Sequence, residues 1–438
     1  MTRLPTTASA SLTPAPGRGA PPASPYGGGS STFSLKPMMD LQPGTLNPEP
    51  RTSLELEDAT TLPTYAKPPV ALVRGDNATV WDADGRAILD LYGGHCVALL
   101  GHCPPRVVEA IRQQAGDLLF YSNAVYSPVR AEASARLVDF APEGLDRVFW
   151  CNSGTEANEA ALKLARAVTG KAGIVAMEGA FHGRTLGALA TTWGDPYHAP
   201  YRAILPQTHF VPFGDAGAVE QALAGGEIAA VILEPIQSMA GIQEAPPAYY
   251  QALRQSCTRH GAMLIFDEVQ TGVGRTGAFS YGEHVGVTPD MVTLAKSLGA
   301  GVPVGATLVS EAIAQTVQSG DQGTTFGGGM LAMAAVHAVL DSLADESLMD
   351  RALALEDAFR DGLSEVPGVR EVRGRGCLLG VELDRPAKPV AASLRDQHAI
   401  LVGTSKHPNT LRLMPPLTTP FGAASELADA LRAVLGTA

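Results

Sequence analysis

DMVTLAKSLGAGVPVG, at residues 290–305, joins an apolar run from Met291 to Ala295 to a single lysine, Lys296. The run predicts a buried strand, so the ammonium of Lys296 would lie at the end of that strand. Burying an ammonium is unfavourable, and desolvation lowers its pKa until the amine becomes a usable nucleophile. Alternatively, the side chain extends from the strand end into solvent. This stretch alone leaves both interpretations open.

Short apolar segments on both sides of this stretch alternate with helical patterns. Strands are expected near residues 147–152, 173–177, 228–235, 262–268 and 304–310, and helices near 105–116, 128–140, 156–168 and 249–260. Continuous apolar strands separated by helices are typical of a mostly parallel sheet that is covered on both faces. The chain is therefore predicted to have an α/β fold.

The pattern changes after about residue 330, where a long helical pattern leads into further helices and short strands. We expect residues 105–330 to form a large domain, and residues 61–104 and 331–438 to form a smaller α+β domain that begins with a hairpin around Asp84 and Gly85. Residues 1–60 are rich in Pro, Ser, Thr and Gly, and they are predicted to be a disordered extension.

Composition limits the class of function. The 438 residues carry a formal net charge of -12, which argues against a nucleic-acid partner, and no apolar run is long enough to cross a membrane. The five cysteines are scattered and odd in number, which favours reduced thiols in the cytoplasm. His95, Cys96, His102 and Cys103 lie close in sequence, but they lack the paired short spacings of a zinc site, so no metal is predicted.

Two strand ends carry candidate binding groups. In CNSGTEANEAALKLA, Ser153, Gly154 and Thr155 come between a strand and a helix, where backbone N–H groups can bind an anion such as phosphate. The S-x-x-E spacing also fits a capping box without any ligand. In LIFDEVQ, Asp267 and Glu268 end an apolar strand, where an acid can pair with a cationic nitrogen or can form a structural cap or salt bridge.

Three further stretches have both a functional and an ordinary interpretation. In GAFHGRTLGA, Phe181 could stack on a planar ring and Arg184 could bind a carboxylate, or the stretch could be a turn with a surface arginine. In QGTTFGGG, Thr324 and Thr325 suit phosphate contacts or an ordinary glycine-rich loop. Arg412, in TLRLMPPL, points to the face opposite its leucine neighbours, which is either a cleft or solvent.

Taken together and in this order, these stretches resemble the class III pyridoxal-phosphate aminotransferases of fold type I, and most closely the acetylornithine and succinylornithine enzymes. The resemblance runs from about residue 70 to the C-terminus and includes ILEPIQ, GTTFGG and LRLMPPL. It implies pyridoxal 5'-phosphate as cofactor. It also implies that Lys296 is the catalytic Schiff-base lysine and that Asp267 pairs with the ring nitrogen. The other cofactor contacts implied are Ser153, Gly154, Thr155, Phe181, Glu268, Val269, Gln270 and, across a homodimer interface, Thr325.

The resemblance also implies the substrates. Arg184, with Thr324 nearby, would bind the α-carboxylate of N2-acetylornithine or a close acyl analogue, and Arg412 would bind a carboxylate of 2-oxoglutarate. Ornithine, succinylornithine and a carrier-protein-linked lysine remain alternative donors. Many relatives carry an acid where this chain has Met239 in EPIQSMAG, an acid that shields the second arginine during the donor half-reaction. Its loss leaves room for a pyridoxal-phosphate racemase or isomerase, which needs no exchange of substrates.

Overall fold

The computed structural model describes residues 52–436, so most of the predicted disordered extension, 1–60, lies outside the described residues. The described end of that segment is helix α1 (Ser53–Thr60) and is not irregular as expected. The backbone N–H of Glu55 donates to Thr52 Oγ1 at 3.3 Å, which is the local capping that favours a helix start.

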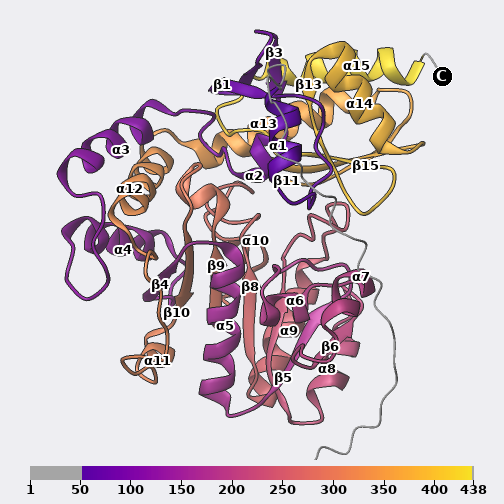
Figure 1. The fold of residues 1–438 in the computed structure, drawn as a ribbon. Helices are drawn as coiled ribbons and strands as arrows, with labels where there is room; N and C mark the ends of the chain where they lie inside the picture. The colour runs from indigo at the N-terminus through magenta and orange to yellow at the C-terminus, as the bar shows by residue number, and fades with distance from the viewer. Residues whose placement is uncertain (1–51, 437–438) are drawn as a thin grey trace, which may run out of the picture. The chain divides into compact units, whose positions relative to one another are not determined.

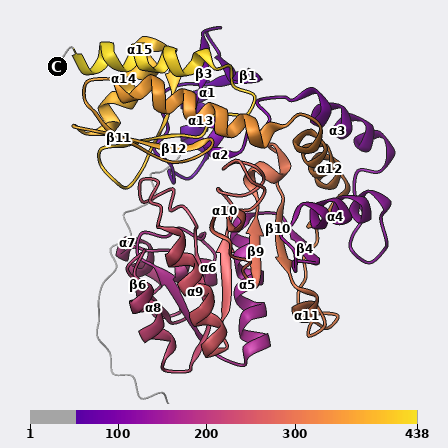
Figure 2. The same ribbon diagram turned by 180° about the vertical axis from the view of Figure 1, so that it is seen from behind.

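A seven-stranded sheet lies at the centre of the chain from residue 60 onward (Figures 1 and 2). Its strand order is β4-β10-β9-β8-β7-β5-β6, and only β10 runs antiparallel to its neighbours. The mostly parallel sheet predicted from the apolar runs is therefore confirmed. The strands are β4 (Arg147–Cys151), β5 (Gly173–Met177), β6 (Thr208–Val211), β7 (Ile228–Leu233), β8 (Met263–Asp267), β9 (Met291–Leu294) and β10 (Gly305–Val309).

Helices cover both faces of this sheet, which is why its central strands are buried along their whole length. Figures 1 and 2 show α5 (Gly154–Thr169) on one face and α8 (Ala216–Leu223) and α9 (Pro247–His260) on the other. The remaining helices and turns of this part are α6 (Leu186–Thr191), α7 (Asp195–His198), η1 (Ala199–Tyr201), α10 (Gly282–Val285), η2 (Lys296–Gly299) and α11 (Glu311–Ala314). Helix α12 (Met330–Asp345) packs against α3 (Pro105–Asp117) and α4 (Pro128–Phe140).

Two four-stranded sheets form the rest of the fold. The first has the order β1-β2-β3-β13 and contains the predicted hairpin around Gly85; its strands are β1 (Leu72–Asp76), β2 (Thr79–Asp82), β3 (Ala87–Asp90) and β13 (Ile400–Leu401). The second, antiparallel, has the order β11-β12-β15-β14, with β11 (Val369–Arg375), β12 (Leu378–Leu383), β14 (Gly403–Thr404) and β15 (Thr410–Leu413). Helices α2 (Gly93–Cys96), α13 (Leu348–Ser364), α14 (Ala387–His398) and α15 (Gly422–Gly436) complete the chain. The pairing of β3 with β13 favours the predicted grouping of residues 61–104 with 331–438, which stays a prediction.

The parallel strands bring their carboxyl ends to one edge of the central sheet. Asp267 ends β8, Glu234 follows β7, and Lys296 follows β9 by two residues. This edge therefore collects the polar residues that the apolar runs had left at their ends.

Candidate active site

A cavity of about 430 Å³ opens at this edge of the sheet. It is large enough for a small organic ligand. Its lining includes Lys296 and most of the predicted site residues: Ser153, Gly154, Thr155, Phe181, Arg184, Asp267, Val269 and Gln270. The structure thus brings together residues that are spread over more than a hundred positions of sequence.

Lys296 lies on the cavity wall, in the first position of η2. Its φ of 42° is in the left-handed region, which a residue with a Cβ adopts at some cost and which is common at functional sites. Burial lowers the pKa of Lys296, against the opposing attraction of Cys96, Asp267 and Glu234. The interpretation of Lys296 as a desolvated amine, and not a lysine extended into bulk solvent, therefore fits the structure.

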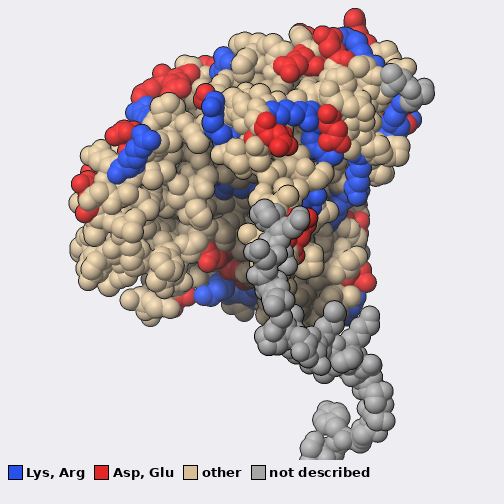
Figure 3. Space-filling view, turned by 45° about the horizontal axis from the view of Figure 1, so that its top comes forward, with Lys and Arg blue, Asp and Glu red and all other residues tan. Residues whose placement is uncertain are grey.

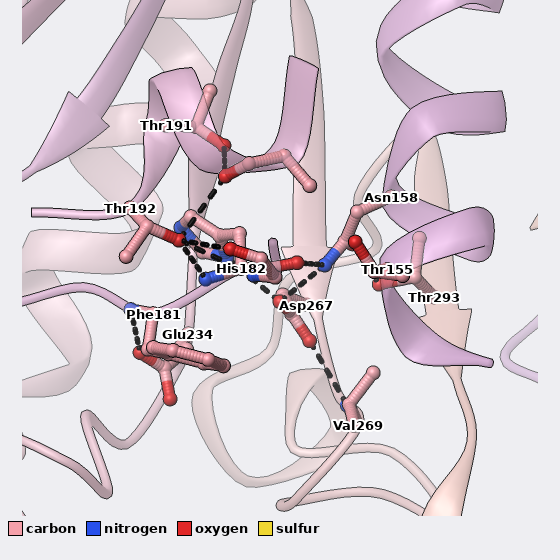
Figure 4. A network of polar contacts seen from close by, with 12 residues as sticks. Thr155, Asn158, Phe181, His182, Thr191, Thr192, Glu234, Asp267, Val269 and Thr293 are labelled. Carbon is pink, nitrogen blue, oxygen red and sulfur yellow. Dashed lines mark hydrogen bonds and ion pairs between the residues drawn. The ribbon is translucent and has the colours of Figure 1, made fainter. Parts of the chain in front are cut away.

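Asp267 is held by three donors (Figure 4). Its Oδ2 accepts hydrogen bonds from His182 Nδ1 and from Asn158 Nδ2, both at 2.7 Å. Its Oδ1 accepts from the backbone N–H of Val269 at 3.1 Å. Asn158 is oriented in turn by Thr293, whose hydroxyl donates to Asn158 Oδ1 at 2.7 Å. These bonds satisfy the buried carboxyl group of Asp267 and fix its orientation at the cavity.

The start of α5 combines both interpretations of its sequence. Ser153 Oγ accepts a hydrogen bond from the backbone N–H of Glu156 at 3.3 Å, so the serine half of the capping box is present, while the Glu156 carboxylate accepts from the backbone N–H of Asn152 at 2.6 Å. Thr155 Oγ1 accepts from the backbone N–H of Arg184 at 3.2 Å, which joins the helix start to the FHGRT loop. Gly183 in that loop has a φ of 134°, and a Cβ there would lie 2.1 Å from Thr155 Oγ1. The loop can therefore approach the helix start only because residue 183 is glycine.

Aromatic rings contact the guanidinium of Arg184 at the cavity wall. Arg184 is exposed, and its guanidinium carbon lies 4.1 Å from the ring centroid of Tyr197 and 5.5 Å from that of Phe181. Lys406 Nζ lies 4.8 Å from the same Tyr197 ring. These contacts hold positive charge beside Phe181, and no ion pair joins Arg184 to an acid among residues 52–436.

Arg412 lies in β15 outside the set of cavity-lining residues and is only 2% exposed. Its Nε donates to the carbonyl of Thr404 at 2.8 Å, and its Nη1 donates to Ser238 Oγ at 3.0 Å. The alternative that Arg412 faces solvent is therefore excluded. Burial lowers the pKa of Arg412, and Tyr92 opposes that shift.

Three of the predicted site residues do not line the cavity. The Glu268 carboxylate accepts hydrogen bonds from Thr271 Oγ1, from Ser280 Oγ and from a backbone N–H of the following loop, so it organises residues 271–281. Thr324 Oγ1 accepts from Asn152 Nδ2 at 3.2 Å, and Thr325 is exposed. None of the three lines the cavity of the described chain, and their cofactor or substrate roles stay predictions.

The described residues fit pyridoxal phosphate. The buried Oε1 of Gln270 has no hydrogen-bond partner among them, so it can accept from the ring hydroxyl. Asp267 offers a compensated carboxylate to a protonated ring nitrogen, and the start of α5 offers N–H groups to a phosphate. A buried acceptor, a buried acid, an amine and an anion site around one cavity are the groups that this cofactor requires.

Sequence reasoning missed three residues of this site. Glu234 lines the cavity, and its Oε1 accepts from the backbone N–H of Phe181 at 2.8 Å (Figure 4). Burial raises the pKa of Glu234 to about 7. His182 and Asn158 are the partners of Asp267. The available signal was that Glu234 closes an apolar strand in ILEP as Asp267 does in LIFD.

The histidines considered for a metal have other partners. The hydroxyl of Tyr92 contacts His95 Nδ1, and His102 Nε2 lies 2.8 Å from Asp90 Oδ2. Within residues 52–436, no group of three or more His, Cys, Asp or Glu side chains is placed to hold a metal ion.

Known proteins match this chain along almost all of its described length. A family model described as aminotransferase class-III matches residues 62–435. The acetylornithine aminotransferase of Methanopyrus kandleri is 46% identical over 384 residues, covering 86% of this chain and 98% of that protein. The corresponding enzyme of Mycolicibacterium smegmatis is 45% identical over 386 residues, covering 87% and 97%.

Solved structures give the same result. The ornithine aminotransferase from Toxoplasma gondii matches with a TM-score of 0.82 at 32% identity, covering 88% of this chain and 95% of that one. The acetylornithine aminotransferase from Elizabethkingia anophelis matches with a TM-score of 0.77 at 30% identity, covering 88% and 98%. The α/β fold predicted from the resemblance is thereby confirmed. The chain belongs to the class-III aminotransferases.

Proposed function

We propose that this aminotransferase moves the terminal amino group of N2-acetylornithine, or of a close acyl analogue, to 2-oxoglutarate, giving the semialdehyde and glutamate. Its place would be in arginine biosynthesis. The observation that carries the proposal is that Lys296, Asp267 and Arg184 line one cavity, while a second arginine, Arg412, is buried within electrostatic reach of Lys296. The names of the relatives in Methanopyrus and Mycolicibacterium support the acetylated donor.

The residues of this chain divide the work. When bound, pyridoxal phosphate supplies an aldehyde that takes up amines and a ring that withdraws electrons. Lys296 Nζ, with its lowered pKa, holds and moves the proton of the substrate carbon that bears the amino group. Asp267 would accept from the ring nitrogen of the bound cofactor and favour its protonated form, and Phe181 would pack against the ring. Gly154 and Thr155 would hold the phosphate at the start of α5.

The two arginines bind two carboxylates that enter in turn. Arg184 binds the α-carboxylate of the donor near the cavity mouth, where it is exposed. Arg412 binds a carboxylate of 2-oxoglutarate, because a buried guanidinium is best compensated by a bidentate anion. Alternating use of one pocket in this way is what ping-pong chemistry requires.

We also propose a cytoplasmic homodimer with Thr325 at the interface. Exposed apolar side chains surround this position: Leu119, Tyr126 and Phe326 are 60%, 104% and 65% exposed, and the Phe120 and Phe326 rings lie 5.1 Å apart. Such a cluster is typical of a protein–protein interface. All five cysteines are free, as in a reducing compartment.

The proposed partners are small molecules and a second copy of the chain; neither a nucleic acid nor a membrane is proposed as a partner. On the face seen in Figure 3, acidic and basic side chains are interspersed and form no continuous basic patch. No helix within residues 52–436 has the length and apolar character needed to span a membrane.

A donor panel tests the proposal. The purified, cofactor-loaded protein is incubated with 2-oxoglutarate and N2-acetylornithine, N2-succinylornithine, ornithine or a carrier-linked lysine, and glutamate is measured. We expect the fastest formation with an acylated ornithine. Failure of every acylated donor would refute the proposal, and loss of donor chirality without need for 2-oxoglutarate would indicate a racemase.

A further inference from the structure

Arg412 is a buried cation that has no carboxylate partner among residues 52–436. Its two side-chain hydrogen bonds go to neutral oxygens, those of Thr404 and Ser238. A guanidinium has five N–H donors and no acceptor, so these two bonds leave donors to be satisfied. A neutral ligand in the pocket would exclude water and leave those N–H donors without hydrogen-bond partners.

Tyr92 is the side chain that lies beside the remaining N–H donors of Arg412. Its ring centroid lies 5.8 Å from the guanidinium carbon of Arg412, and the interaction of Tyr92 with that guanidinium opposes the lowering of the Arg412 pKa. Gly403, which is paired with Arg412 across β14 and β15, makes room for the ring, since a Cβ at Gly403 would lie 2.4 Å from Tyr92 Cε2. The lack of a side chain at Gly403 therefore makes room for the Tyr92 ring beside Arg412.

His95 fixes the orientation of that hydroxyl. Because the Arg412 guanidinium has no acceptor, the Tyr92 oxygen can act toward it only as an acceptor, and the Tyr92 proton has to go elsewhere. The neighbouring acceptor is His95 Nδ1, which contacts the hydroxyl. Burial, with the positive charges of Lys296 and Arg412, lowers the pKa of His95 to about 3, so the ring is neutral and Nδ1 can accept.

A buried carboxylate holds the loop that carries this pair. Asp90 Oδ1 accepts from the backbone N–H groups of Tyr92 and Gly93 at 2.9 and 3.0 Å, and its Oδ2 is bound by His102. At the other end of the loop, the carbonyl of Cys96 accepts from Ser297 Oγ at 3.2 Å, next to Lys296. The pair is therefore tied to the lysine as well as to the arginine.

We propose that Tyr92, oriented by His95, is the uncharged cover of Arg412 and determines which substrates the pocket accepts. The proposal rests on the proposed function. With a donor that has a single carboxylate, which Arg184 binds, the hydroxyl oxygen of Tyr92 stays beside the guanidinium. With 2-oxoglutarate, the second carboxylate takes its place on Arg412. A neutral cover leaves the full positive charge of Arg412 available to the second substrate, so no acid has to be moved away.

Tyr92→Phe tests this selectively. We expect the dissociation constant of N2-acetylornithine to rise about tenfold or more, because the donor complex then buries an uncovered guanidinium. The variant is expected to bind glutarate, a five-carbon dicarboxylate without the oxo group, as tightly as the parent or more tightly. Binding of glutarate and of valerate to the cofactor-loaded enzyme is measured by calorimetry, and the donor half-reaction is followed in single turnover.

Two histidine variants and one tyrosine control complete the experiment. His95→Leu should reproduce Tyr92→Phe, whereas His95→Asn keeps an acceptor near the position of Nδ1 and should stay close to the parent. Tyr249→Phe, which removes another buried hydroxyl, should leave the preference for glutarate over valerate unchanged. Equal effects of Tyr92→Phe on donor and dicarboxylate, no effect on either, or equal effects of the two histidine variants would overturn the inference. Failure of the parent with every acylated donor would instead overturn the proposed function.

Discussion

Replacing Glu234 by glutamine tests whether burial or pairing with positive charge dominates the pKa of Glu234. Glu234 is 4% exposed, and its Oε1 accepts from the backbone N–H of Phe181 at 2.8 Å. Glutamine keeps that acceptor and removes only the titrating group. Electrostatic interactions with His182 and Lys296 favour the ionisation of Glu234, and the interaction with Asp267 opposes it. Burial acts in the opposite direction and is the larger effect.

The sign and size of the effect follow from proton linkage. Burial raises the pKa of Glu234 from 4.5 to about 7. Between these values the folded protein keeps a proton that the unfolded chain has released, so this group's contribution to stability is full below pH 4.5 and is lost as the pH rises through 7. At about 1.4 kcal/mol per pKa unit, the contribution that is lost amounts to roughly 3 kcal/mol. The Glu234→Gln variant does not titrate and should escape this loss.

The assay is urea unfolding of the parent and of Glu234→Gln at about pH 5 and pH 8, with the cofactor removed so that Lys296 is free. Between the lower and the higher pH, the free energy of unfolding of the variant should rise on the order of 1–3 kcal/mol relative to that of the parent. The exposed Glu109→Gln variant controls for the substitution itself. A variant that instead loses relative stability at the higher pH would show that pairing with Lys296 outweighs burial, and the reasoning would be refuted.

Three further predictions concern the same site. Lys296→Ala should lower turnover by at least about a hundredfold in the glutamate assay, while the exposed Lys388→Ala changes it little; normal turnover of Lys296→Ala would refute the whole assignment. Gly183→Ala should weaken cofactor binding in a fluorescence titration, because its Cβ would displace Thr155; unchanged affinity would show that this loop does not set the phosphate site. Glu268→Gln should lower unfolding stability by about 1–3 kcal/mol, since an amide cannot accept all of its hydrogen bonds, and an equal midpoint of denaturation would contradict this.

The sequence was most informative where a polar residue interrupts an apolar run. Asp267 and Lys296 end such runs, and the structure places both on the cavity wall. The helix from Pro128 to Phe140 was predicted with its observed bounds because proline and serine mark its start. Strand β6 was not predicted, since the four residues from Thr208 to Val211 at the sheet edge include a histidine and show no clear period.

Partners that meet only after folding could not be predicted. His182 and Asp267 are separated by 85 residues, and each has an ordinary interpretation alone. The surroundings of Arg412 were harder still, because Tyr92 reaches it from the other end of the chain through a space left by Gly403. Periodicity places a side chain on a face of a strand, but it does not say which distant loop covers that face.

The two acids at the ends of neighbouring strands show how the fold divides charge within the site. Asp267 receives three hydrogen bonds, from His182, Asn158 and a backbone N–H, and these bonds compensate for the burial of its carboxyl group. Glu234 receives a single backbone bond, and its pKa rises to about 7. Environments that separate two acids in this way assign them different roles. Below about pH 7 Glu234 is mostly protonated, so its attraction for the Lys296 ammonium weakens, and burial is then opposed less in lowering the pKa of Lys296.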